Sequence, residues 1–194
     1  MLMDTSLFHR EVVPFILTLA LLIVATLLGD YVLHVLGLVW IGRYLGIPGT
    51  LLILLSFGYS LRKRKLIQTG NPGRLLSLHV ALTLLGALMV LIHAGVHFNA
   101  ILPWLALAAM LLNVISGLVG KFLLDRSRRH VTARRESYRL KGMAKSEMER
   151  EVFWDAVTYE LMTKWRAVHF PITLVFVVLA LGHIVSIFLF WNWR

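Results

Sequence analysis

The sequence contains no cysteine, and this absence removes several kinds of site at once. Disulfide bridges, thiolate metal sites, iron–sulfur clusters and covalently attached haem all depend on cysteine, so none of them can form within this chain. Any haem that this chain holds must therefore be bound by histidine or methionine.

Charged residues are missing from long stretches of the chain, and these stretches are apolar. Of 194 residues 58% are hydrophobic, which is far more than a soluble domain of this length would carry. We therefore expect an all-α integral membrane bundle that forms a single domain over residues 1–194. The five predicted spans cover residues 12–28, 50–61, 75–97, 104–124 and 168–191. The first apolar run lacks a following small-x-small site, so a cleaved signal peptide is not expected.

Two segments between the spans are less regular. Residues 30–46 are apolar but interrupted by Asp30, His34 and Arg43, which is typical of an interfacial segment or of an extended end of the first span. Residues 125–167 form a long basic connection. A capping-box pattern at Ser146 and apolar residues at near-helical spacing predict an amphipathic cytoplasmic surface helix over 147–166.

The formal charge of +10 would suit nucleic acid, but the cations are distributed as in a membrane protein. Of 20 Lys and Arg residues, five lie in 62–74 and twelve in 121–167. The positive-inside rule makes both segments cytoplasmic, so the N-terminus is expected inside and the C-terminus outside. A bacterial inner membrane is the expected location, with membrane lipid and no nucleic acid as a partner.

Two predicted spans carry histidines at the same spacing. His79 and His93 lie fourteen residues apart on one span, and His169 and His183 lie fourteen apart on another. Fourteen residues make nearly four helical turns, so each pair shares a face, with about 21 Å between its members. A bilayer core is about 30 Å thick, so one imidazole lies near each boundary.

The predicted topology makes these two spans parallel and so selects the partners across them. His79 would face His169 at the inner side, and His93 would face His183 at the outer side. Two stacked histidine pairs suit two b-type haems with two axial nitrogens each. A proton or metal-ion pathway, or four unrelated polar residues, are the alternatives to this interpretation. His97, four residues after His93, is expected to be a neighbouring or surface group.

Small and basic residues near these histidines are further candidates for cofactor binding. Gly86 lies midway between His79 and His93, and Gly182 adjoins His183, so either leaves room for a flat ring. Close packing of helices explains such glycines nearly as well. Candidate partners for haem propionates at the inner side are Arg74, Lys121, Lys164 and Arg166, for which contact with lipid headgroups is the alternative. Pro171 disfavours helical backbone just before it, so His169 is expected in a first turn or beside a kink.

The histidine pattern resembles that of the membrane domain of ferric reductases and NADPH oxidases, and that of the haem core of respiratory cytochrome b. The resemblance covers roughly residues 75–191, the expected di-haem core, and includes the segment Ser116–Phe122. It implies electron transfer across the membrane, with His79, His93, His169 and His183 as axial ligands. The sequence contains no G-x-G-x-x-G, so NAD(P)H oxidation by this chain alone is not expected. It also lacks the Pro-Glu-Trp-Tyr motif of quinol-oxidising cytochrome b, so a quinone site would be of another type.

The expected function is that of a di-haem cytochrome b subunit between a quinone pool and other redox subunits, such as multihaem cytochromes c, iron–sulfur proteins or flavoproteins. A quinone is a further candidate ligand. One alternative is the membrane component of a ferric-reductase-like enzyme that works with a separate flavoprotein on ferric iron, oxygen or methionine sulfoxide. A haem-free scaffold or transporter is the other. The basic segment is expected to rest on lipid, with docking of an acidic subunit as the alternative.

Overall fold

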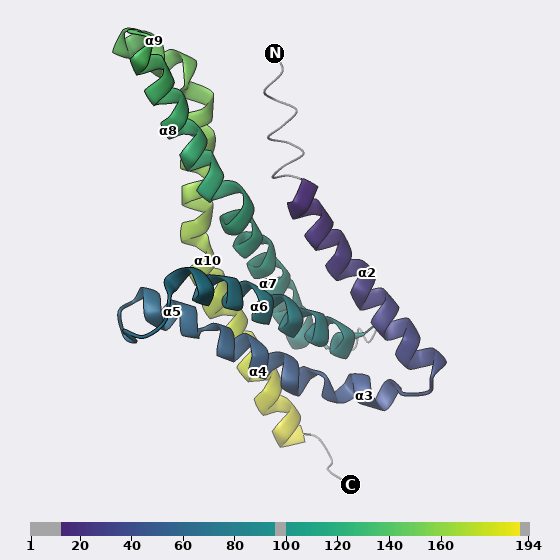
Figure 1. The fold of residues 1–194 in the computed structure, drawn as a ribbon. Coiled ribbons are helices and arrows are strands. Elements are labelled where there is room, and N and C mark those ends of the chain that lie inside the picture. Colours follow the sequence, from purple (N-terminus) through teal and green to yellow (C-terminus); the bar gives the residue numbers. More distant parts are fainter. Residues whose placement is uncertain (1–12, 96–99, 191–194) are drawn as a thin grey trace. The chain divides into compact units, whose positions relative to one another are not determined.

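A computed structural model describes residues 13–95 and 100–190 (Figure 1). Every regular element within these residues is a helix. Five helical segments are long and apolar enough to cross a membrane: Val13–Val35, Val39–Lys63, Gly73–Ala94, Ile101–Phe122 and Ala167–Phe190. The all-α class, the five spans and the membrane character expected from the sequence are thereby confirmed.

The chain forms two compact units. The first, which we call the α2–α6 unit, comprises residues 19–114 and 173–194. The second, which we call the hairpin unit, comprises residues 1–18 and 115–172. Helices α2, α7 and α10 each contribute residues to both units.

The first span is longer than predicted, because Asp30 and His34 do not end it. Helix α2 runs from Val13 to Val35, and the His34 Nδ1 lies 2.8 Å from the carbonyl oxygen of Asp30 one turn earlier. The chain leaves the helix at Gly37, whose φ is +68°, and the Leu38 N–H donates to the Leu33 carbonyl at 2.8 Å. Such a positive φ favours glycine and ends a helix in this way. Of the two alternatives for residues 30–46, the extended first span is correct up to Val35.

The second span consists of three short helices in succession. They are α3 (Val39–Tyr44), α4 (Gly46–Ser56) and α5 (Gly58–Lys63), and only Leu45 and Phe57 separate them. Both of these residues keep right-handed helical backbone angles. The predicted span over 50–61 was therefore too short. Pro48 does not interrupt it, because the first turn of α4 needs no donor at that position.

Helix α6 (Pro72–Ala94) carries the first histidine pair and packs against α4 (Figure 1). The Asn71 side chain caps its start by accepting from the Gly73 N–H at 2.9 Å. The two helices approach most closely at Gly49 and Gly86. A Cβ on Gly86 would lie 2.7 Å from the Gly49 carbonyl oxygen, so only glycine permits this approach.

The remaining helices follow without long loops. Helix α7 (Ile101–Leu118) passes directly into a π-helical segment, η2 (Val119–Leu124), and then into α8 (Asp125–Leu140). Gly142, with φ +69°, ends α8, and α9 (Lys145–Glu151) follows. The last helix, α10, runs from Phe153 to Phe190.

The structure does not confirm the separate surface helix predicted over 147–166. The break falls at Val152, and from Phe153 the chain is helical without interruption into the last span. Helix α10 even continues through Pro171, as membrane helices can when neighbouring groups compensate for the missing N–H. His169 consequently lies in the interior of a helix, well after its first turn.

Candidate functional site

The His79 side chain on α6 is held by the backbone of the second span. Its Nδ1 lies 2.8 Å from the carbonyl oxygen of Ser56, the last residue of α4, and its ring centroid lies 5.6 Å from that of Tyr59. A carbonyl can only accept, so Nδ1 carries the hydrogen and the lone pair remains on Nε2. The Ser56 hydroxyl is satisfied separately by the Ile53 carbonyl at 2.6 Å.

The His93 side chain is held in the same way at the other end of α6. Its Nδ1 lies 3.3 Å from the carbonyl oxygen of Gly42, a buried residue of α3. A Cβ on Gly46 would lie 2.8–2.9 Å from Cγ, Cδ2 and Nε2 of the ring. Gly46 therefore packs directly against the ring, and a larger residue at this position would collide with it.

The two histidines thus share one arrangement. In each, Nδ1 donates to a backbone carbonyl from the second span, which leaves Nε2 as the acceptor. Metal-bound histidines almost always have such a partner on the other ring nitrogen, because it fixes the tautomer and the ring orientation. The sequence prediction missed these carbonyls, and backbone acceptors leave no signal in a sequence.

His183 on α10 lies in the same compact unit as His93. It is half-buried. Both members of the predicted outer pair thus belong to one unit, and their pairing stays a prediction. Ten residues before His183, a side-chain hydrogen bond links α10 to α7, with the Thr173 hydroxyl donating to Asn113 Oδ1 at 2.9 Å.

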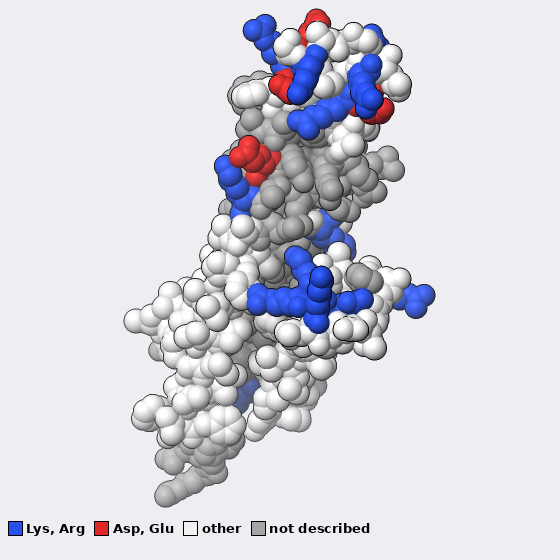
Figure 2. Space-filling view, turned by 90° about the vertical axis from the view of Figure 1, so that its left-hand side faces the viewer, with Lys and Arg blue, Asp and Glu red and all other residues white. Residues whose placement is uncertain are grey.

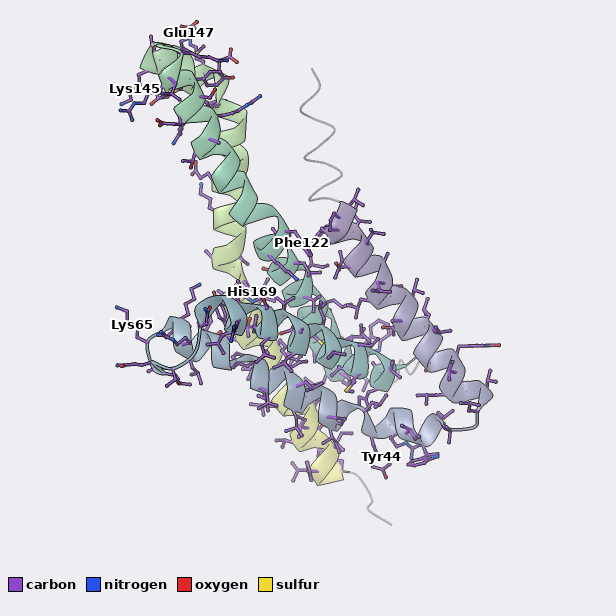
Figure 3. The ribbon with its side chains drawn as sticks, in the orientation of Figure 1. Tyr44, Lys65, Phe122, Lys145, Glu147 and His169 are labelled. Carbon is purple, nitrogen blue, oxygen red and sulfur yellow. The ribbon has the colours of Figure 1, made fainter. Side chains whose placement is uncertain are left out.

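His169, labelled in Figure 3, belongs to the hairpin unit. The Cε1 of its ring lies 3.6 Å from the position that a Cβ on Gly117 would occupy, so the absent side chain leaves the ring uncrowded there. His79 belongs to the other unit, and the inner pair of His79 with His169 stays a prediction.

A buried hydroxyl lies on the same face of α6 as His79. Thr83 comes one turn later, and its Oγ1 is buried with no hydrogen-bond partner among the residues that the structure describes. Leaving such a group unsatisfied costs about 1–3 kcal/mol. A polar atom of a bound group beside His79 would remove this cost.

The two candidate glycines serve helix packing in the structure. Gly86 packs against Gly49 of α4. A Cβ added to Gly182 would lie 3.5 Å from the Leu102 side chain of α7, which is an ordinary van der Waals distance. Close packing of helices, the alternative to leaving room for a flat ring, therefore describes the surroundings of both glycines.

The candidate basic residues have varied surroundings. Arg74 and Lys121 are exposed, and the Lys121 ammonium lies 5.0 Å from the centroid of the Phe122 ring. The Lys164 ammonium lies 2.9 Å from a carboxylate oxygen of Glu160, so it already has an anionic partner. Hydrogen bonding and charge from Lys164 lower the pKa of Glu160 below its ordinary value. The Arg166 side chain and His97 lie outside the part of the chain that the structure describes.

Comparison with protein-family models, with curated proteins and with solved structures finds no match to this chain. The resemblance to di-haem membrane proteins therefore depends on the histidines and their spacing.

The residues present fit a haem with two histidine ligands in three respects. The donors are imidazoles, their Nδ1 atoms on α6 are anchored, and an unsatisfied hydroxyl lies beside one of them. His79, His93, His169 and His183 would hold the iron, which when bound gives the site a reversible one-electron change. The apolar helices around them would keep water from the metal.

Proposed function

We propose that this chain is a di-haem membrane cytochrome b, a subunit that carries electrons across the membrane between a quinone pool and other redox subunits. The observation that carries the proposal is the matched anchoring of His79 and His93 through Nδ1 to the carbonyls of Ser56 and Gly42. A proton pathway or a structural histidine would not require both rings to keep the same nitrogen available.

The chain's own part in this function is to position and tune the ligands. The backbone carbonyls orient each ring and raise the basicity of Nε2, which strengthens its bond to iron. Burial of the histidines in apolar helices keeps the surroundings of the iron at low dielectric. Both factors influence the reduction potential of a haem, since ligand, hydrogen bonding and burial are what a protein can vary.

A visible spectrum of the purified chain tests the proposal directly. We expect a b-type band on reduction, with about two haems per chain by the pyridine haemochrome assay. His93→Ala should remove about half of the haem, and His79→Ala the same amount.

His34→Ala provides a matched control, because the Nδ1 of His34 also bonds to a backbone carbonyl but within its own helix. This variant should keep the full haem content. A wild-type chain without haem, or equal loss in the His34 and His93 variants, would contradict the proposal.

A further inference from the structure

The basic connection between the last two spans is a helical hairpin whose two arms continue these spans as helix. Within the hairpin unit, η2 passes into α8 with no non-helical residue at Leu124–Asp125. Likewise, α10 is helical from Phe153 through the start of the last span at Ala167. A helix that lies on the bilayer surface must break where its chain enters the span, and neither arm does. Figure 1 shows the two arms, α8 and the first part of α10, joined by α9.

The length of the first arm matters for the cations at its far end. The fourth span ends at Phe122, and Arg135 follows thirteen residues later, roughly 20 Å along the helix. The headgroup layer on each side of a bilayer is only about 5–7 Å thick. Attraction to anionic lipid decays within about 10 Å, so Arg135 and Arg139 lie beyond its reach.

The composition of this arm also disfavours lipid. Of the sixteen residues in α8, only Val131, Ala133 and Leu140 are aliphatic. A helix that binds at a membrane surface needs a continuous apolar face, and α8 has none. The segment is therefore built to face water or a polar partner.

The charge at the end of α8 is predominantly positive and open to solvent. Residues 134–145 contain five cations and one acid, Glu136, and the rest of α9 adds the exposed acids Glu147, Glu149 and Glu151 and one cation, Arg150. We name the four exposed cations of residues 134–145 the basic surface: Arg135, Arg139, Lys141 and Lys145. Arg135 and Arg139 lie one turn apart on one face of α8. The carboxylate of Glu136 is 3.9 Å from Arg139 and is itself exposed, so it offsets little of this charge. In Figure 2 blue side chains, with some red ones among them, lie at the end of the molecule drawn at the top.

The turn that carries the basic surface is well defined. Gly142 has φ +69°, and the Met143 N–H donates to the Tyr138 carbonyl at 3.2 Å. Val152, at the junction of α9 and α10, is only 1% exposed. A fixed turn holds the cations in place without the loss of entropy that a loose loop would incur on binding.

We propose that the basic surface is a docking site for a soluble protein that presents an acidic surface. It fits such a partner because it is cationic, exposed, rigidly held and too far from the bilayer for lipid to neutralise it. If the partner also carries electrons, that property rests on the proposed function. Its acidic and soluble character is inferred from the basic surface alone.

The test uses the full chain in nanodiscs of phosphatidylcholine, with a fluorescent polyglutamate peptide as the acidic probe. The triple reversal Arg135→Glu, Arg139→Glu, Lys141→Glu should weaken peptide binding at least about tenfold. The matched control reverses three cations at the other basic segment, Lys63→Glu, Arg64→Glu and Lys65→Glu. It should change binding less than about twofold.

Three results would overturn the proposal. If both triple variants weakened peptide binding equally, the affinity would depend only on the total charge of the chain. Retention of full affinity by the hairpin variant would exclude the basic surface. Competition by phosphatidylglycerol in the nanodisc, as strong as the reversal itself, would assign the surface to lipid. Haem content is measured in the same samples. Absence of haem would count against the proposed function, whereas the docking proposal is judged by peptide binding alone.

Discussion

The positions of His79 and His93 show how a side chain in a membrane helix depends on the backbone of its neighbour. Each imidazole donates to a carbonyl of the second span. A buried donor in an apolar layer is costly when unpaired, so these bonds fix the rings as well as stabilise them. Fourteen-residue spacing predicted that the histidines share a face of α6. It could not predict the acceptors, because which carbonyls lie opposite depends on how two helices pack.

Replacement of Gly46 should disturb the His93 ring without touching the histidine itself. In Gly46→Ala the new Cβ would lie 2.8 Å from the ring, closer than real contacts allow. The ring must then shift and its bond to Gly42 lengthen. We expect the haem affinity at this position to fall about tenfold, the size of effect seen when the partner of a metal-bound histidine is lost.

Gly58→Ala is the control for this prediction. Gly58 also begins a short helix of the second span, but nothing lies within 4 Å of its Cβ position. Haem titration of both variants, followed by visible absorbance, gives the comparison. Equal affinities in the two variants would show that the surroundings of His93 do not matter for haem.

At the scale of elements, the second span differed most from expectation. Its continuity through α3, α4 and α5 was hidden in the sequence by Gly46, Pro48 and Gly49, which usually mark turns. In the structure Gly49 instead allows α4 to approach α6. The number of spans and their helical structure could be predicted from the length of the apolar runs, because a segment in the bilayer must form its backbone hydrogen bonds within itself. The breaks within the span depend on packing and were not predictable.

The crossing of α4 and α6 should be the point of the α2–α6 unit most sensitive to added volume. In Gly86→Ala the Cβ would meet the Gly49 carbonyl and Ile53 Cγ1 at 2.7 Å. We expect the free energy of unfolding in detergent to fall by about 1–3 kcal/mol, the usual cost of overpacking.

Gly120→Ala is the matched substitution, because nothing lies within 4 Å of its Cβ position. It should leave stability unchanged or raise it by up to about 1 kcal/mol, since alanine is the better helix former. Thermal or denaturant unfolding of both variants measures the difference. A Gly86 variant as stable as the Gly120 variant would mean that the two helices can separate without cost.

For the whole molecule, five spans and two basic segments define the expected topology. An odd number of spans puts the two ends of the chain on opposite sides. Both basic segments, which include Lys65 and Arg139, then lie on the same side, where the positive-inside rule places cations. This arrangement makes α6 and the last span parallel, and the pairing of histidines into an inner and an outer set depends on it.

The absence of cysteine allows this topology to be measured on single-cysteine variants. Gln68→Cys lies between α5 and α6, Lys141→Cys lies at the turn of the hairpin, and Leu36→Cys lies between α2 and α3; all three positions are exposed. A membrane-impermeant maleimide added to intact cells should label Leu36→Cys alone. In inverted vesicles it should label the other two. If Gln68→Cys and Lys141→Cys label from opposite sides, α6 and α10 are antiparallel. His79 would then pair with His183, and the basic hairpin would lie on the opposite side of the membrane from the other basic segment.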